Sequence, residues 1–226
     1  MDRQTQKELL EIVRRNYEEI ASDFNETRKK NSWPILSELA EAVKDGERIL
    51  DVGCGNGRLL AALAGKKISY TGLDQSEKLL AFARENYPQG KFEPGNLLEL
   101  SQFKEINFDR VFCLAVLHHL PGSDLRLAAL KQLKNKIKDD GRIIITVWNL
   151  WSQPKFRKLI LRYGLLKMIK KNKMDFSDIL FSGFSGSQRY YHAFTRHELK
   201  KIVYQAGLKP EKIHKDEYNY YLVLRK

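Results

Sequence analysis

The most informative stretch of this chain is Ile49-Leu50-Asp51-Val52-Gly53-Cys54-Gly55-Asn56-Gly57. Its aliphatic start, with Arg48 before it, is typical of a short buried strand. Glycines follow at alternate positions, and glycine lets a backbone approach a ligand closely and turn straight into a helix. The residues from Arg58 to Ala64 have the pattern of that helix. The stretch therefore predicts a strand, a ligand-binding glycine loop and a helix in immediate succession.

The spacing of the glycines separates two kinds of nucleotide site. A dinucleotide site prefers G-x-G-x-x-G, which leaves room for a pyrophosphate over the helix N-terminus. Here the third glycine, Gly57, comes one residue early, and an acid, Asp51, precedes the first glycine, Gly53. The loop thus resembles that of the S-adenosylmethionine (SAM) methyltransferases. In that family, the acid and the loop hold the methionine end of the cofactor, which carries an ammonium group and has no pyrophosphate.

Later strand ends extend the cofactor site. Asp74 ends a second predicted strand, Ile68–Asp74, where its carboxylate can accept hydrogen bonds from both ribose hydroxyls. Asn96 follows a third strand, where the family has a polar contact to the adenine; a simple turn residue is the equal alternative. Leu114 ends the next strand and is expected to line the cofactor through backbone groups. The predicted cofactor-binding residues are Asp51, Gly53, Gly55, Gly57, Asp74, Asn96 and Leu114.

Strands and helices alternate along most of the chain, which favours a parallel sheet with helices on both faces. The end of the chain departs from this rhythm, because two strand-like runs lie close enough to form a hairpin. We therefore expect an α/β, Rossmann-like SAM methyltransferase fold, with a mostly parallel sheet and a C-terminal antiparallel hairpin. The further predicted elements are the helix Ser76–Asn86 with Ser76 as N-cap, the strand Asp109–Leu114, the helix Asp124–Ile137, a turn at Asp139-Asp140-Gly141, the strand Arg142–Trp148, the helix Arg196–Ala206, and the hairpin of Lys209–His214 and Tyr218–Leu224.

Two regions lie outside this alternation. N-terminal helices are expected within residues 6–45. Residues 152–188 contain an amphipathic run, Lys155–Lys171, and a flexible run of small residues interrupted by aromatics, Phe181–Ser187. We expect one domain over residues 1–226, with the stretch 152–188 as an insertion or lid over the carboxyl edge of the sheet, where open α/β sheets bind ligands. A surface helix followed by a disordered loop is the equal alternative.

The composition restricts the class of protein. The chain has 226 residues, of which 42% are hydrophobic and 30% charged, and this excludes wholesale disorder. No apolar run approaches the roughly 20 residues that a membrane span needs. Two cysteines, Cys54 and Cys113, cannot build a disulfide framework or a zinc site alone. We therefore expect a cytoplasmic protein with reduced thiols and no metal.

The positive charge is concentrated in one part of the chain. Forty basic residues against 28 acidic ones give a net charge of +12, and +8 of it lies between Trp151 and Lys200. A basic excess in one stretch indicates a polyanionic partner, either a nucleic acid or an anionic membrane surface. A well-solvated basic protein without such a partner is the alternative. Of the two polyanions we favour nucleic acid.

Four further motifs bear on the methyl acceptor. They are Tyr17 with Thr27-Arg28, His118-His119, Trp148-Asn149 and Gln188-Arg189-Tyr190-Tyr191-His192. With these motifs the sequence resembles the tRNA wobble-uridine carboxymethyl methyltransferases, the family that includes the methyltransferase domain fused to a human AlkB homologue. The resemblance extends from near the N-terminus to about Leu199 and includes Trp33-Pro34. A good number of methyltransferases share the double histidine, whereas the Arg-Tyr-Tyr-His run is much more distinctive.

The resemblance implies esterification of a 5-carboxymethyl group on the uridine at the first anticodon position. A carboxylate with a pKa of about 4 is already ionised at neutral pH, so no strong general base is needed. Arg28 and Arg189 are expected to anchor this carboxylate or neighbouring phosphates, because guanidinium forks suit both. His119 and His192 are expected to hydrogen-bond the uracil or its substituent. The structural alternative for Arg28 is a pair with an acid.

Three aromatic residues complete the predicted acceptor site. Tyr17, Trp148 and Tyr190 are the expected substrate contacts, and Tyr190 and Trp148 would stack on or wall the flipped base. For Trp148 the structural alternative is the end of a buried strand. Two neighbours, His118 and Tyr191, are expected to pack rather than to bind.

The chain departs from this family in two places. The family has a Val-Pro-Trp segment before the Arg-Tyr-Tyr-His run, where this chain has Phe181–Ser187, and the stretch Lys155–Lys173 is unusually basic. Substrate recognition can therefore differ from the family's. The implied partners are tRNA and, as in many eukaryotic members, a small zinc-binding activator protein, whose need the sequence leaves open.

Two other functions are compatible with the sequence. A methyltransferase with a small-molecule or lipid-like acceptor would use the helix at 152–173 as a lid or on a membrane surface. A SAM-binding domain without activity would serve as a scaffold in an RNA-modifying complex. The complete cofactor loop argues against the scaffold, which has no chemical need for these residues.

Overall fold

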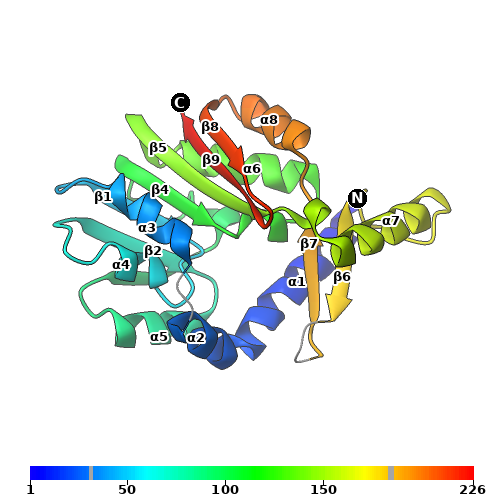
Figure 1. Ribbon diagram of the computed structural model, residues 1–226, viewed down its shortest axis with the longest axis horizontal. Helices are drawn as coiled ribbons and strands as arrows, with labels where there is room; N and C mark the ends of the chain where they lie inside the picture. The colour runs from blue at the N-terminus through cyan, green and yellow to red at the C-terminus, as the bar shows by residue number, and fades with distance from the viewer. Residues whose placement is uncertain (31–32, 183–185) are drawn as a thin grey trace.

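The computed structural model describes residues 1–30, 33–182 and 186–226. Within them, a seven-stranded sheet has the strand order β3-β2-β1-β4-β5-β9-β8 (Figure 1). Neighbouring strands among the first five are parallel, whereas β9 pairs antiparallel with both β5 and β8. The predicted mostly parallel sheet with a C-terminal antiparallel hairpin is confirmed. The strands are β1 (Arg48–Val52), β2 (Ser69–Asp74), β3 (Lys91–Pro94), β4 (Phe108–Leu114), β5 (Ile137–Trp148), β8 (Lys209–Lys215) and β9 (Asn219–Arg225).

The sheet is buried on both faces, because successive side chains of its strands enter two different apolar cores. Along β1, Leu50 and Val52 belong to one core and Ile49 to the other, and none of the three is more than 1% exposed. Helices α6 and α8 cover the first face, and α3, α4 and α5 cover the second. Burial on both faces is the rule for parallel sheets. These helices are α3 (Pro34–Glu41), α4 (Arg58–Ala62), α5 (Glu77–Asn86), α6 (Ser123–Lys134) and α8 (Arg196–Gln205).

The predicted turn at Asp139-Asp140-Gly141 lies inside a strand instead. The register between β4 and β5 shifts at this point, where β5 carries extra residues and bulges. A Cβ at Gly141 would lie only 3.0 Å from the carbonyl oxygen of Phe108, so the two strands approach each other closely here. The turn-forming residues therefore shape a bulge, because the chain on both sides of them pairs with the same strand.

Two helices precede α3, and only the first of them was expected. The sequence predicts a helix over residues 7–21, and α1 (Arg3–Glu19) confirms it. The next helix, α2 (Ala21–Lys30), is largely polar, with Phe24 as its one large apolar side chain, so no apolar stripe announces it. Helix α1 packs against the second, smaller sheet of the molecule, because Leu9 and Val13 share a buried cluster with Tyr190.

The smaller sheet belongs to the basic region. Helix α7 (Pro154–Met168) confirms the predicted amphipathic helix, and it points away from the main sheet in Figure 1. After it, β6 (Asp178–Ser182) and β7 (Gln188–His192) form a two-stranded antiparallel sheet that the sequence did not predict. The run Phe181–Ser187 was expected to be flexible, but its first two residues end β6. Residues 183–185 lie outside the described residues.

The helices end and begin where local chemistry favours it. Ser76 caps α5 as predicted, because its side chain accepts a hydrogen bond from the Leu79 N–H at 3.3 Å. Pro34 and Pro154 open α3 and α7, where a missing N–H costs nothing. In the described part of the chain, no helix combines the length and the apolar character needed to cross a membrane.

Candidate functional site

A cavity of about 930 Å³ opens at the carboxyl ends of β1, β2, β4 and β5. It is closed by α1, α2, the start of α7 and the β6–β7 sheet. Its volume lies in the upper part of the range of cofactor and small-molecule sites. We distinguish two groups of lining residues. The loop half consists of Asp51, Gly53, Gly55, Asp74, Asn96 and Leu114, and the arginine half consists of Tyr17, Arg28, His119, Trp148 and Arg189.

The loop half begins where β1 ends. Gly53 has a φ of 78° and Gly55 a φ of 56°, in the left-handed region that favours glycine. A Cβ at Gly53 would overlap the Val116 side chain, and one at Gly55 would lie 3.3 Å from the Phe24 ring. The Gly53 N–H donates to the carbonyl oxygen of Leu73 at 2.7 Å. The loop is therefore tied to the end of β2, with no space for a side chain at Gly53 and a tight contact with Phe24 at Gly55.

Asp74 fastens the same loop from the end of β2. One carboxylate oxygen accepts a hydrogen bond from the Gly55 N–H at 2.8 Å, and the other accepts one from the Ser76 N–H at 2.9 Å. Burial raises the pKa of Asp74, and the backbone hydrogen bonds oppose this rise. Each carboxylate oxygen can accept more than one hydrogen bond, so Asp74 can also bind a ligand hydroxyl.

Asp51 has a buried oxygen without a partner. The side chain is only 2% exposed, and the Tyr70 hydroxyl donates to its Oδ2 at 2.8 Å. Its Oδ1 has no hydrogen-bond partner among the described residues. Burial raises the pKa of Asp51 to about 7, with the charge of Asp74 adding to this effect and the Tyr70 hydrogen bond opposing it. A carboxylate in this state favours a cationic group beside it in the cavity.

Of the three remaining residues predicted to bind the cofactor, two line the cavity and one does not. Asn96 and Leu114 line the cavity. Asn96 also accepts a hydrogen bond from the Leu98 N–H at 3.0 Å, so it is both a turn residue and a lining residue. Gly57 does not line the cavity, and a Cβ on it would lie 2.8 Å from the Tyr87 ring. The expected cofactor contact of Gly57 is therefore corrected to a packing role at the start of α4.

In the arginine half, Tyr17 and His119 form a neutral pair. The Tyr17 hydroxyl lies 2.8 Å from His119 Nε2, and His119 Nδ1 lies 3.3 Å from the carbonyl oxygen of Tyr190. A carbonyl only accepts, so Nδ1 carries the proton and Nε2 accepts from the Tyr17 hydroxyl. Burial lowers the pKa of His119 to about 4 and raises the pKa of Tyr17. Both side chains are therefore uncharged at neutral pH.

Arg28 and Arg189 bring positive charge to the same half. Each has a buried Nε without a hydrogen-bond partner among the described residues. The Arg28 guanidinium lies over the Phe24 ring, 5.0 Å from its centroid. A third guanidinium, Arg58, also lines the cavity, and burial followed by the charge of Arg28 lowers its pKa to about 10. The arrangement favours an anionic ligand with planar oxygen pairs, which guanidinium groups bind best.

Aromatic rings form one wall of this half. Trp148 stacks on Tyr191 with centroids 4.7 Å apart, and Tyr191 stacks on Phe181 at 5.3 Å. Trp148 and Phe181 line the cavity, whereas Tyr191 is 3% exposed between them, as expected for a packing residue. His118 is fully buried beside them, and its Nδ1 accepts a hydrogen bond from the Trp148 N–H at 3.2 Å. Trp148 thus ends a buried strand and lines the cavity as well.

Two predicted residues of the Arg-Tyr-Tyr-His run do not reach the cavity. His192 is 2% exposed, and both of its ring nitrogens contact carboxylates outside the cavity. Tyr190 is fully buried against α1. Successive side chains of a strand point to opposite faces, so Tyr190 and His192 lie on the face of β7 opposite Arg189. The expected substrate contacts of Tyr190 and His192 are corrected for this reason.

The structure adds lining residues that sequence reasoning missed. Arg58 follows the glycine loop as the first residue of α4, so its position in the motif could have indicated it. Phe156 and Phe181 lie in the basic region, where their apolar character was noted but not their place in the cavity. Asn219 comes from the start of β9 and has no local signal, because only the antiparallel return of the chain brings it to this edge.

Comparison with known proteins gives a consistent result. A family model described as "Methyltransferase domain" matches residues 50–145. A Xenopus tropicalis protein named tRNA (carboxymethyluridine(34)-5-O)-methyltransferase alkbh8 is 33% identical over 149 residues, which is 66% of this chain and 23% of that protein. The chain therefore spans about a quarter of the length of this relative.

Two further similarities cover nearly the whole chain. An Encephalitozoon cuniculi (strain GB-M1) protein, described only as a methyltransferase, is 30% identical over 216 residues, 95% of each chain. A solved structure titled "DhpI-SAM-HEP complex" has a TM-score of 0.72 and 18% identity, and the match covers 96% of this chain and 98% of that one. The latter similarity concerns the fold.

Proposed function

The chain belongs to the SAM-dependent methyltransferases, and on this basis we propose that it esterifies the carboxymethyl group of 5-carboxymethyluridine at the wobble position of tRNA. The observation that carries this choice of acceptor is the pair of guanidinium groups, Arg28 and Arg189, which line one cavity and whose buried Nε atoms find no hydrogen-bond partner in the described part of the chain. The named Xenopus tropicalis relative supports the same acceptor.

The loop half fits SAM. The Oδ1 of Asp51, which has no hydrogen-bond partner within the described ranges, suits the ammonium of the methionine moiety, which would complete the hydrogen bonding of this buried atom. Asp74 ends β2 with both oxygens able to accept from the ribose hydroxyls. Gly53 and Gly55 keep the loop free of side chains where the cofactor would lie against the backbone.

The arginine half needs only to orient an ionised acceptor. When bound, SAM supplies a methyl group that is already activated by its sulfonium. The arginine half would present one oxygen of the acceptor carboxylate to this methyl group, and the sulfur would leave with the electron pair of its bond to the methyl carbon. No proton moves, because the carboxylate is ionised at neutral pH. Arg28 and Arg189 would hold the carboxylate behind the methyl group, and such alignment is the main task of the enzyme in this reaction.

The neutral residues of the arginine half suit the base of the acceptor nucleotide. With a pKa of about 4 and both ring nitrogens already paired, His119 stays neutral and orients the Tyr17 hydroxyl, whose oxygen can still accept a hydrogen bond from the base. Tyr17 holds the His119 ring in place at 2.8 Å. Trp148 and Phe181 offer ring faces to a flipped uracil, which RNA-binding proteins commonly use to hold an unstacked base.

The test uses total tRNA from a strain deleted for this gene. The pure protein is incubated with this tRNA and methyl-labelled SAM, and the labelled nucleoside is identified by mass spectrometry after digestion. The expected product is 5-methoxycarbonylmethyluridine. Label in a different nucleoside would retain RNA as substrate and reject the carboxylate reaction. If no label enters while SAM still binds, repeating the assay with cell extract separates the need for an activator protein from a wrong acceptor.

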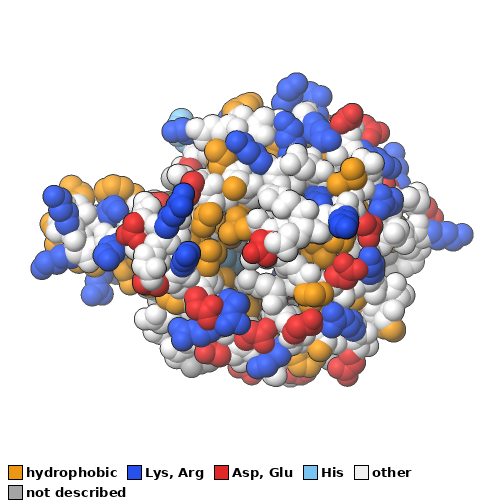
Figure 2. Space-filling view, turned by 180° about the vertical axis from the view of Figure 1, so that it is seen from behind, with side chains coloured by type: hydrophobic (Ala, Val, Ile, Leu, Met, Phe, Trp, Pro, Cys, Tyr) orange, Lys and Arg blue, Asp and Glu red, His pale blue; other side chains and the backbone are white. Residues whose placement is uncertain are grey.

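A lipid-like or small-molecule acceptor is the second candidate. One observation favours it: Leu161, Leu165 and Met168 are each about 60–70% exposed along one side of α7. Lysine and arginine side chains surround such apolar groups on the projecting lobe in Figure 2. A short helix of this kind can lie on an anionic membrane. Binding to vesicles that contain phosphatidylserine, without binding to tRNA, would favour this candidate over the first.

A further inference from the structure

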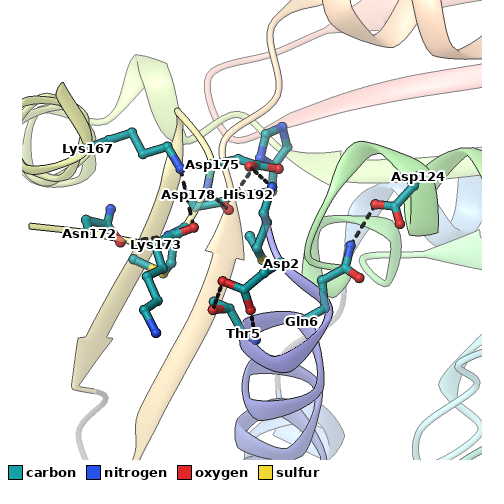
Figure 3. Close-up of polar contacts among 12 residues, drawn as sticks. Asp2, Thr5, Gln6, Asp124, Lys167, Asn172, Lys173, Asp175, Asp178 and His192 are labelled. Carbon is teal, nitrogen blue, oxygen red and sulfur yellow. Dashed lines mark hydrogen bonds and ion pairs between the residues drawn. The ribbon is translucent and has the colours of Figure 1, made fainter. Parts of the chain in front are cut away.

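His192 lies between two carboxylates, away from the cavity. Its Nδ1 is 2.7 Å from Asp178 Oδ1, and its Nε2 is 2.7 Å from Glu198 Oε1. The His192 and Asp178 side chains are 3% and 0% exposed. Figure 3 shows the contact of His192 with Asp178 near the start of α1, with Asp175 beside it. Acids from β6 and from α8 thus hold the two edges of one imidazole ring.

This geometry has a consequence for the charge of the ring. Ionised carboxylate oxygens can only accept hydrogen bonds, so each ring nitrogen has to donate, and a histidine that donates from both is the imidazolium. Arg126, which is 2% exposed, has its Nη2 3.7 Å from Glu198 Oε1. Two cations, His192 and Arg126, therefore face the two acids. Charged side chains are found buried when, as here, each cation lies beside an acid.

Strand β7 connects this network to the arginine half. His192 ends the strand on which Arg189 lies three residues earlier, and the two side chains point to opposite faces. Between them, the carbonyl oxygen of Tyr190 is 3.3 Å from His119 Nδ1. His119 in turn contacts the Tyr17 hydroxyl. A shift of β7 would therefore move the Arg189 guanidinium and the carbonyl oxygen that His119 contacts.

We propose that His192, held as an imidazolium by Asp178 and Glu198, is a positioning residue that fixes β7 so that Arg189 and His119 are placed for methyl transfer. His192 contacts neither substrate in this role. The role rests on the function proposed above for the arginine half, whereas the charge of the ring does not depend on that function.

The proposal predicts that β7 is anchored through both edges of the His192 ring. Nδ1 holds it to Asp178 of β6 and Nε2 holds it to Glu198 of α8, so removing the charge of either acid should loosen the strand. The ionisable groups that face the network are Asp178 of β6 with Asp175 before it, Glu198 of α8, Arg126 of α6, Tyr190 of β7, His118 and the amino group of Met1.

The first experiment needs no acceptor. The protein is labelled with ¹⁵N-histidine and its ring nitrogens are observed by NMR at pH 7 without substrates. We expect protons on both ring nitrogens of His192. His197, exposed on α8 five residues further along, is the control in the same spectra. A His192 ring with a single proton would overturn the proposal.

The second experiment measures methyl transfer to tRNA by variants that each keep part of the hydrogen bonding around His192. Glu198→Gln keeps a polar group beside Nε2 but removes its charge, and His192→Asn keeps a donor near Asp178. We expect kcat to fall about tenfold or more in both, because small displacements of positioning groups are costly, while the Kd for SAM stays within twofold. His197→Gln is the control.

The outcomes separate this proposal from the proposed function. A folded Glu198→Gln protein with unchanged kcat would overturn the positioning role, and so would an equal loss of SAM affinity in that variant. If His192→Asn does not fold, Glu198→Gln alone decides. If the natural protein transfers no methyl group to tRNA, the proposed function fails, and the ¹⁵N measurement still decides the charge of His192.

Discussion

The two halves of the cavity are built in different ways. Most of the loop half comes from one continuous stretch of alternating strands and loops, from Asp51 to Leu114, and backbone geometry at strand ends shapes it. The arginine half is assembled from α1, α2, the turn after β4, β5 and β7, and it depends on the packing of the β6–β7 sheet against α1. One half is therefore a property of local sequence and the other a property of tertiary structure.

The halves also differ in charge. The loop half contains the carboxylates Asp51 and Asp74, and the arginine half contains the guanidinium groups of Arg28 and Arg189. A cationic cofactor and an anionic acceptor would each be attracted to the opposite charge, and this would bring them together in one orientation. Changes in one half should therefore affect one ligand and spare the other.

The largest expected effect is that of Arg189→Ala on methyl transfer. Without this guanidinium the acceptor carboxylate loses an orienting group, and kcat/KM should fall on the order of 10²–10³-fold. The Kd for SAM, measured by calorimetry, should stay within twofold. Arg162→Ala is the matched control, because Arg162 is exposed on α7. A comparable loss of SAM affinity in Arg189→Ala would show that the two halves do not act separately.

Gly53→Ala tests the loop half in the same way. The new Cβ would overlap the Val116 side chain at a φ of 78°, so the loop must shift. If restoring the binding conformation of the loop costs about 2 kcal/mol, the affinity for SAM should fall about thirtyfold. Gly65→Ala is the control, since Gly65 has a φ of 85° but nothing within 4 Å of its Cβ position. It should lower stability by about 1 kcal/mol and leave SAM binding unchanged.

Sequence reasoning could predict the loop half because its signals are local. The strand–glycine–helix succession at residues 48–64 requires particular residues at particular positions, and a parallel sheet with helices on both faces follows from the alternation of strands and helices. Where two strong local signals compete, the prediction fails: Asp139-Asp140-Gly141 has turn-forming residues but lies in the bulge of β5. The pairing of β5 with β4 on both sides of these residues makes them a bulge and not a turn.

The arginine half could be predicted only through resemblance to a family, and then incompletely. The Arg-Tyr-Tyr-His run marks a stretch of chain, but it does not say which of its side chains share a face. Had β7 been recognised as a strand, alternation would have assigned Arg189 and Tyr191 to one face and Tyr190 and His192 to the other. Asn219 has no signal in its own neighbourhood, so only the folded chain reveals it.

The pH dependence of SAM binding sharpens the contrast in charge. Asp51 has a pKa of about 7 in the free protein, and only its ionised form can pair with an ammonium. Binding a cation lowers this pKa, so affinity for SAM should rise as pH rises through 7. Between pH 6 and pH 8 the expected gain is about tenfold. Asp51→Asn should remove this dependence, and a similar slope in that variant would assign the titration to another group.

The smallest expected effect lies outside both halves, on the basic surface that would meet tRNA. Lys170 and Lys173 are exposed near the end of α7. If each neutralises one phosphate, replacing either by glutamine should reduce the slope of log Kd against log salt concentration by about one. Lys212→Gln, on the exposed β8 strand at the edge of the main sheet, is the control.

Replacing Lys170 or Lys173 by glutamine should leave the Kd for SAM and the transfer to a short anticodon stem-loop nearly unaltered, because neither half of the cavity contains these lysines. Equal slopes for the natural protein and both variants would mean that tRNA approaches from another side. The cavity would then have to recognise its acceptor mainly through the contacts of the arginine half, and Arg189→Ala should weaken binding as strongly as it slows transfer.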